Sequence, residues 1–321
     1  MYTCSFCGFS STVLDDFEHD TYGFECPDCI SYNYYNEVSE EVRHNFRLLL
    51  EKVDNSSLSS SLPSFKPTFP TRVSPLRYPG GKSKMVGQIY ARTRKENMIH
   101  FAEPFAGGAS VGLSLLLSGN IQELYLNELD YGIYSLFWTI KSNPEYLLQK
   151  ISSFLPTKEA YYSAQKAVFS DYNGLSKESA GWIALVVNRL SFSGICKANC
   201  MSNPAARWNA STLTKRIRSI AAVSEHIHVS NMDACSFIEE FYWNPNSTIF
   251  IDPPYYKKGK ALYNKYYSEA DHQALSYLLD ELYRGMPGAD MIVTYDNCNF
   301  IQSIYEYPLK EVVGRIYCIA N

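Results

Sequence analysis

The sequence lacks several features that would place the protein in other classes. It has no apolar run of about 18 residues, so we expect no membrane span. It has no N-terminal basic region followed by an apolar core, so we expect no signal peptide. It has no basic excess either, because its net charge is −4, and a nucleic-acid partner would need a local basic surface. These absences favour a cytoplasmic or nucleoid-associated protein without a membrane partner.

Two common nucleotide-binding motifs are incomplete. Gly81-Lys82-Ser83 matches the end of a P-loop, but Leu76 stands where that loop needs its first glycine. Residues 107–111 lack the full Gly-x-Gly-x-x-Gly pattern of nicotinamide-dependent oxidoreductases. Both segments still let the backbone approach an anion closely, because glycines impose no Cβ there.

Nine cysteines in a chain without a signal peptide favour a reducing compartment. Four of them form two Cys-x2-Cys pairs, Cys4 with Cys7 and Cys26 with Cys29. Each pair can turn two thiolates towards one ion, and four thiolates complete the tetrahedral shell of a structural zinc. The spacing therefore predicts a zinc ribbon over residues 1–35, with four free or redox-active cysteines as the alternative.

A chain of 321 residues can hold two domains. Apolar residues recur at helical spacing over residues 37–53, and a segment rich in Ser and Pro continues to residue 75. We therefore expect the ribbon over residues 1–35, a helix and linker over 36–75, and a larger domain over 76–321.

Strands and helices alternate in this larger domain. Short apolar segments predict strands over residues 99–103, 123–127, 228–233, 246–251, 291–296 and 312–320. The long interval over about 156–225 predicts helices at 158–169 and 178–190, an irregular or hairpin segment at 191–200, and a basic helix. The pattern indicates an α/β fold with a doubly wound, mostly parallel sheet that carries a helical and hairpin insert.

A glycine turn follows the first predicted strand. Gly107 and Gly108 precede an apolar helix over residues 111–118, an order that brings a helix N-terminus close to an anion. Glu128 ends the next strand, where an acid can bind ribose hydroxyls, and a solvated or helix-capping role is its alternative. Lys82 adds an ammonium group for an anion.

The segment Asp252-Pro253-Pro254-Tyr255 follows the strand over 246–251, at the end where open α/β sheets bind ligands. Proline supplies a carbonyl without an N–H donor and fixes φ, so acceptors can be held rigidly. Asp252 adds a carboxylate, and Tyr255 adds a flat aromatic ring. This combination suits the exocyclic amine of a planar base, and a plain exit from strand to loop is the alternative.

Basic and polar residues gather in the insert of this acidic chain, and the basic helix adds Lys215, Arg216 and Arg218. We expect phosphate and base contacts here, with a solvated helical surface as the alternative. The candidate contact residues are Arg189, Ser193, Lys197, Asn199 and Arg207.

The motifs from residue 76 onwards resemble the Dam-type DNA N6-adenine methyltransferases of the alpha group. The resemblance rests on residues 76–82, on 103–110, on 252–255, and on Asn188-Arg189 with Phe192-Ser193-Gly194, in that family's order with its target-recognition insert before the catalytic motif. It implies a Rossmann-like methyltransferase that uses S-adenosylmethionine and double-stranded DNA. The implied catalytic residues are Asp252, Pro253 and Tyr255, and the implied cofactor-binding residues are Tyr78, Lys82, Phe105, Gly107, Gly108, Glu128, Asp233 and Asp252.

Other functions stay open at this point. A non-catalytic DNA-binding protein on the same fold is one, although the intact Asp-Pro-Pro-Tyr disfavours it. An N4-cytosine or RNA methyltransferase is another, because the same acceptors fit any exocyclic amine. A restriction-system partner and the oligomeric state are likewise left open.

Overall fold

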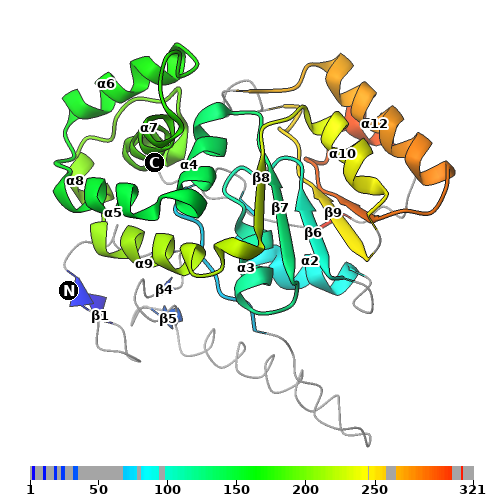
Figure 1. Cartoon of the computed structure of the whole chain (residues 1–321), viewed down its shortest axis with the longest axis horizontal. Coiled ribbons are helices and arrows are strands. Elements are labelled where there is room, and N and C mark those ends of the chain that lie inside the picture. The colour runs from blue at the N-terminus through cyan, green and yellow to red at the C-terminus, as the bar shows by residue number, and fades with distance from the viewer. Residues whose placement is uncertain are drawn as a thin grey trace, which may run out of the picture. The chain divides into compact units, whose positions relative to one another are not determined.

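The computed structural model describes residues 68–77, 81–93, 98–244, 246–257, 265–305 and 312–313, together with the backbone of short strands before residue 35 (Figure 1). The chain divides into two compact units, Met1–Thr68 and Phe69–Asn321. In the first unit, β1 (Tyr2–Thr3) pairs antiparallel with β2 (Ser10–Ser11). A second antiparallel sheet contains β3 (Glu18–His19), β4 (Gly23–Glu25) and β5 (Tyr32–Tyr34).

Two predictions for the N-terminal region lie outside the described residues. These are the four-cysteine zinc site at Cys4, Cys7, Cys26 and Cys29, and the helix over 37–53. Within the described part of the chain, no group of three or more His, Cys, Asp or Glu side chains can hold a metal ion. The zinc ribbon therefore stays a prediction.

The second unit is built on a five-stranded parallel sheet. Its strands in sheet order are β10 (Asp290–Val293), β9 (Ser247–Ile251), β6 (His100–Glu103), β7 (Glu123–Asn127) and β8 (Ile227–Ser230). The chain runs outward from β6 through β7 to β8 and then returns to the other side of β6 as β9. This reversal makes the gap between β6 and β9 the switch point where doubly wound sheets bind ligands. The predicted α/β fold with a parallel sheet is confirmed.

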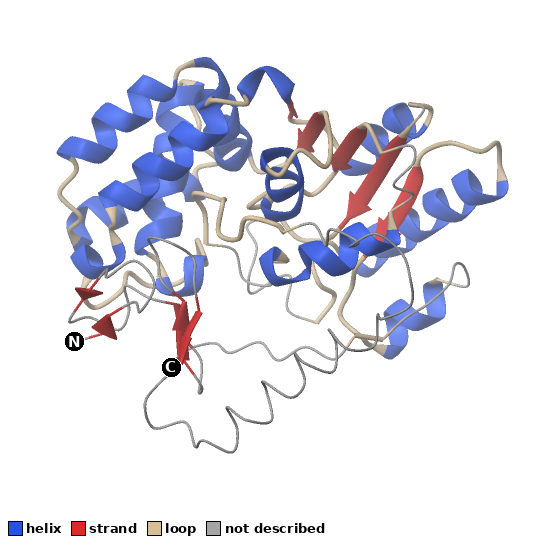
Figure 2. Cartoon of the chain, turned by 90° about the horizontal axis from the view of Figure 1, so that it is seen from below, coloured by secondary structure: helices blue, strands red, loops and turns tan. Residues whose placement is uncertain are grey.

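Helices cover both faces of the sheet, as Figure 2 shows from below. Successive strand residues point to opposite faces, so Phe101 packs with α2 (Val86–Arg92) and α3 (Ser110–Leu117) in one apolar cluster. Its neighbour Ala102 joins the other cluster with α10 (Ala234–Tyr242) and α12 (Glu269–Arg284). Because both faces are covered, every residue of β9 is buried, and its last three, Ile249, Phe250 and Ile251, are apolar.

The part of the chain that connects β7 to β8 forms a helical region, on the left of Figure 1. It contains α4 (Tyr131–Ser142), α5 (Pro144–Ser153), α6 (Lys158–Phe169), α7 (Lys177–Leu190), α8 (Pro204–Arg207) and α9 (Ala210–Ala221). Side-chain oxygens cap the N-termini of these helices and accept the free N–H groups, at Asp130, Asn143, Thr157, Ser176, Asn203 and Asn209. We call residues 156–225 the helical insert; it has its own core around Tyr161, Tyr172 and Val187.

Two local expectations need correction or fall outside the described residues. The strand expected over 228–233 ends at Ser230, because Asp233 caps α10, a helix that we did not expect. Residues 191–200, expected to be irregular or a hairpin, are irregular: they form a loop with a 3-10 turn, η4 (Phe192–Gly194), closed by a single bridge between Ser191 and Cys200. Of the strand expected over 312–320, only residues 312–313 are described, and they are irregular. Among the described residues, no helix has the length and apolar character of a bilayer-spanning segment.

Candidate active site

A buried ion pair marks the switch point of the sheet. Asp252 follows β9 directly, and its two carboxylate oxygens each lie 2.6 Å from Lys82 Nζ. The Lys82 side chain is only 4% exposed and that of Asp252 is 21% exposed. Burial of a lysine is unfavourable unless the charge is paired, so this ion pair holds Lys82 beside the ends of β6 and β9.

Tyr255 joins the same group. Lys82 Nζ donates a hydrogen bond of 2.7 Å to the Tyr255 hydroxyl and lies 5.0 Å from the centre of its ring. Pro253, between the two catalytic candidates, is buried. The structure therefore brings together residues from two separate motifs, Lys82 from one and Asp252 with Tyr255 from the other.

Thr294 is part of the site and was not among the sequence candidates. Its hydroxyl donates to Asp252 Oδ1 at 2.6 Å. The sheet register indicates this role. Val293 is paired with Ile251, so the next residues, Thr294 and Asp252, leave the sheet at the same edge.

Glu103, the last residue of β6, contributes a buried carboxyl group. It is 3% exposed, and its Oε1 accepts a 2.5 Å hydrogen bond from the N–H of Gly112 in α3. The pKa of Glu103 is raised to about 8, chiefly by burial; the Gly112 N–H opposes the rise, the Asp252 carboxylate contributes to it, and Lys82 opposes it.

Gly112 was also missed as a site residue. A Cβ there would lie 2.3 Å from Leu124 Cδ1 and 2.8 Å from Glu103 Oε1. Only glycine lets the first turn of α3 pack this closely on β6 and β7. The sequence signal is a glycine that follows the Gly107-Gly108 turn inside an apolar helix.

The glycine turn and the end of β7 are joined through Glu128. Gly107 has a φ of 49°, and its N–H donates to Glu128 Oε2 at 2.8 Å. The N–H of Asp130 donates to Glu128 Oε1 at 3.0 Å. Burial raises the pKa of Glu128 to about 7, with a smaller upward effect from the Asp130 carboxylate, while these N–H groups lower it. Glu128 and the turn thus lie at adjacent strand ends, as the sequence predicted.

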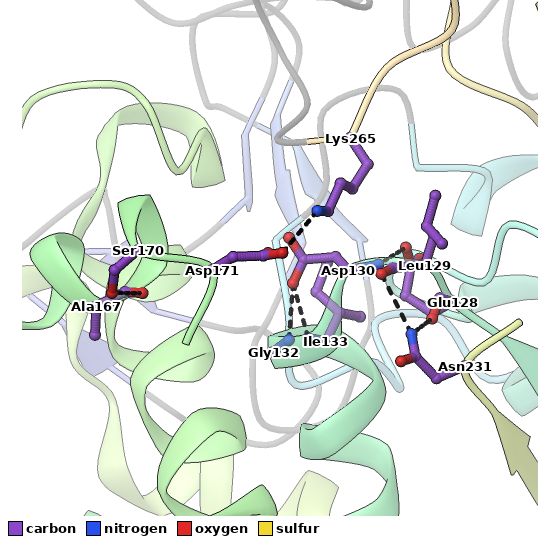
Figure 3. Close-up of polar contacts among 10 residues, drawn as sticks. All are labelled: Glu128, Leu129, Asp130, Gly132, Ile133, Ala167, Ser170, Asp171, Asn231 and Lys265. Carbon is purple, nitrogen blue, oxygen red and sulfur yellow. Dashed lines mark hydrogen bonds and ion pairs between the residues drawn. The ribbon is translucent and has the colours of Figure 1, made fainter. Parts of the chain in front are cut away.

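Figure 3 shows the surroundings of Glu128. Asn231 Nδ2 donates to the carbonyls of Glu128 and Leu129, at 2.6 and 3.2 Å. Asp130 Oδ1 accepts hydrogen bonds from the N–H groups that begin α4. In the helical insert, Asp171 forms an ion pair with Lys265 at 3.0 Å. The end of β7 is therefore fixed by backbone and side-chain contacts from two other segments.

The remaining cofactor candidates are placed less centrally. Asp233 is exposed, and its Oδ1 accepts from the N–H groups of Cys235 and Ser236 at the start of α10. Phe105 is partly buried, and its ring makes an edge-to-face contact with Tyr267, with the two ring centres 5.4 Å apart. Gly108 is buried in the turn after β6, and Tyr78 lies outside the described residues.

The DNA-binding candidates do not form one exposed surface. Arg189 is 4% exposed, and its guanidinium lies 3.5 Å from the carbonyl oxygen of Arg207. Arg207 and Ser193 are partly buried, and Ser193 has a φ of 54°. Lys197 and Asn199 are exposed, with Lys197 Nζ 5.3 Å from the centre of the Tyr266 ring. Of the five candidates, only these last two are exposed.

Asn188 links the insert to the segment that leads to Lys82. Its Oδ1 accepts from the N–H of Arg77 and its Nδ2 donates to the carbonyl of Arg77, both at 2.7 Å. Gly194 lies against the same carbonyl, because a Cβ there would approach it to 2.2 Å. The Asn188 and Gly194 signature thus has a structural role that sequence spacing alone did not reveal.

A doubly wound parallel sheet, with a buried carboxylate and lysine at its switch point and an aromatic ring beside them, defines a nucleotide-type α/β enzyme site. The family model of the D12 class N6 adenine-specific DNA methyltransferases matches residues 78–315. The chain belongs to this family and is an adenine-specific DNA methyltransferase. No curated protein matches the sequence.

Proposed function

We propose that the protein transfers a methyl group from S-adenosylmethionine to N6 of an adenine that has been flipped out of double-stranded DNA, as a Dam-type enzyme of the alpha group. The observation that carries this proposal is the convergence of Asp252, Lys82 and Tyr255 at the switch point. Membership of the D12 class supplies the adenine specificity. A base inside a duplex cannot reach such a site, so flipping is part of the proposal.

The residues present fit the proposed cofactor. Glu128 has the acceptor atoms for ribose hydroxyls, and the turn at Gly107 and Gly108 allows a close approach to the methionyl part. Phe105 lies beside that turn, and Tyr78 and Asp233 stay predictions as further contacts. When bound, S-adenosylmethionine supplies an electrophilic methyl group on a sulfonium.

Lys82 was predicted to lie near the cofactor carboxylate. In the structure its ammonium contacts both oxygens of Asp252 and the hydroxyl of Tyr255. We infer that the Lys82 ammonium contacts the same acceptors that the adenine amine uses. The ammonium must give up at least one Asp252 oxygen when the amine binds, and it is then available to an anionic group.

The chemistry of the proposed step follows from the acceptors. Asp252 and the carbonyl of Pro253 accept the two N6 hydrogens, which weakens the conjugation of the nitrogen lone pair with the ring and directs this lone pair at the methyl group. Tyr255 stacks on the base. As N6 gains the methyl group it carries a surplus proton, and the Asp252 carboxylate is positioned to accept it. Positioning and fixed dipoles provide most of the acceleration, because the thioether leaves readily.

The helical insert is proposed to contact DNA. Lys197 and Asn199 are exposed and are available for phosphate or base contacts, and Arg189, Ser193 and Arg207 support the loop that presents them. A restriction-system partner remains an untested expectation.

The test is methyl transfer to unmethylated genomic DNA with labelled S-adenosylmethionine, followed by digestion to nucleosides. We expect label in N6-methyldeoxyadenosine, and none with Asp252→Ala at retained cofactor binding. Label in N4-methyldeoxycytidine, or in RNA alone, contradicts the proposal.

Zinc at Cys4, Cys7, Cys26 and Cys29 is a separate proposal with its own test. We expect about one zinc per chain by elemental analysis of the purified protein. Cys4→Ser with Cys7→Ser should remove it, whereas Cys298→Ser should not. Equal zinc in all three proteins contradicts the site.

A further inference from the structure

The residues that follow β10, Thr294-Tyr295-Asp296, lie beside the catalytic segment Asp252-Pro253-Pro254-Tyr255. β10 is parallel to β9, and the N–H of Thr294 donates to the carbonyl of Ile251 at 2.9 Å. The two chains therefore leave the sheet together, one as Thr294-Tyr295-Asp296 and the other as Asp252-Pro253-Pro254-Tyr255.

Two side chains of this exit hold the catalytic segment at its two ends. The Thr294 hydroxyl donates to Asp252 Oδ1 at 2.6 Å. Asp296 Oδ1 accepts from the N–H of Tyr256 at 3.2 Å, and its Oδ2 accepts from the N–H of Lys257 at 3.4 Å. Thr294 therefore holds Asp252, the first catalytic residue, and Asp296 holds the backbone immediately after Tyr255.

The segment between these contacts needs support from outside. Pro253 and Pro254 have no N–H groups, so the backbone cannot donate a hydrogen bond at either position. The carboxylate of Asp252 is only partly buried, and Lys82, which contacts both of its oxygens, must give up at least one of them when the target amine binds. A hydroxyl on Oδ1 fixes the rotation, and the carboxylate of Asp296 fixes the backbone that carries the Tyr255 ring.

We propose that Thr294 and Asp296 are positioning residues for methyl transfer, which orient the Asp252 carboxylate and the Tyr255 ring towards the target amine. This inference rests on the proposed function of Asp252 and Tyr255. Neither residue has to touch the cofactor or the DNA, so they act through the catalytic segment.

The expected effects separate positioning from binding. Thr294→Val keeps the shape and the backbone contact with Ile251 but removes the hydroxyl, and a hydrogen bond to a charged group is worth about tenfold to a hundredfold in rate. We expect this loss in the single-turnover rate, with cofactor and DNA affinities changed by less than about threefold. Thr294→Ser should restore most of the rate, because it keeps the donor.

Asp296 gives a second, independent set of variants. Asp296→Ala should slow the single-turnover step by about tenfold, and Asp296→Asn should lose less, since its amide oxygen can still accept one N–H. If Thr294→Val does not fold, Thr294→Ala compared with Thr294→Ser carries the same test.

The experiment measures single-turnover transfer of labelled methyl to DNA by the full chain, alongside thermal unfolding and cofactor titration. Thr139→Val is the matched control, since its hydroxyl bonds the Ser135 carbonyl inside α4, and it should leave the rate unchanged. Wild-type rates in Thr294→Val, a Ser variant as slow as the Val variant, or a loss confined to affinity overturns the inference. A wild-type protein that labels no adenine overturns the proposed function as well, whereas an active wild type with unaffected variants overturns only the positioning role.

Discussion

Two buried cations show how the carboxyl edge of the sheet differs from the helical insert. Lys82 and Arg189 are each 4% exposed. Lys82 makes an ion pair with Asp252 at the carboxyl edge of the sheet. Arg189 instead contacts the backbone carbonyl of Arg207, within the helical insert. A buried cation paired with a carboxylate at a switch point is typical of a working site, and we predict that Arg189 mainly supports the packing of its insert.

The largest effect is expected at Asp252. Asp252→Asn keeps the size of the side chain but replaces one acceptor oxygen with a donor group, which cannot accept an N6 hydrogen. We expect methyl transfer to fall by about a thousandfold or more, with cofactor affinity within about threefold of wild type. Single-turnover assays and cofactor titration measure these quantities. Substantial transfer by this variant would place the catalytic acceptor elsewhere.

The comparison of the two cations gives the next prediction. Lys82→Met should lower the transfer rate by about tenfold to a hundredfold at near-normal thermal stability, because it removes the partner of Asp252. Arg189→Met should instead lower the unfolding temperature by several degrees, because it disturbs the packed insert. Paired measurements of rate and unfolding temperature decide the point. If both variants lose mainly stability, the distinction between site and scaffold is wrong.

These expectations show which parts the sequence could predict. The strands, the glycine turn and the Asp252 segment were predictable because each is encoded by adjacent residues with a clear period or composition. Thr294 and Gly112 were not, because their roles depend on the register between strands distant in sequence and on how closely a helix packs. The sequence did not predict helix α10, because an acid such as Asp233 can either end a strand or cap a helix.

The insert was the least predictable region for the same reason. Its helices followed the apolar period closely, and α6 begins and ends where expected. The direction of each basic side chain depends on tertiary packing, and composition alone could not distinguish buried Arg189 from exposed Lys197. Charge clustering along a sequence therefore predicts a surface poorly when the segment has its own core.

A pH dependence should appear in cofactor binding at the sheet edge. The pKa of Glu128 is raised to about 7, so before the cofactor binds Glu128 is mostly protonated at pH 6 and mostly ionised at pH 8. Ribose hydroxyls donate to the ionised form, so the affinity for S-adenosylmethionine should rise about tenfold from pH 6 to pH 8 and level off above. Titration calorimetry across this range measures it.

Glu128→Gln is the control for that pH dependence. It keeps an acceptor oxygen but does not titrate, so its affinity should be weaker at pH 8 and nearly independent of pH. A variant with the same pH slope as the wild type would assign the titration to another group, such as Glu103, whose pKa is also raised.

The smallest effect is expected at the exposed side of the insert. Lys197→Ala should weaken DNA binding only a few-fold and reduce the slope of log affinity against log salt by about one, because a single phosphate contact releases about one counterion. Lys166→Ala is the matched control, since Lys166 is an exposed lysine of α6 in the same insert without a predicted DNA contact. Fluorescence anisotropy at several salt concentrations compares the two. An unchanged slope in Lys197→Ala, or the same change in both variants, would mean that the 191–200 loop does not contact the phosphates, and the DNA-binding surface would have to be sought on another part of the chain.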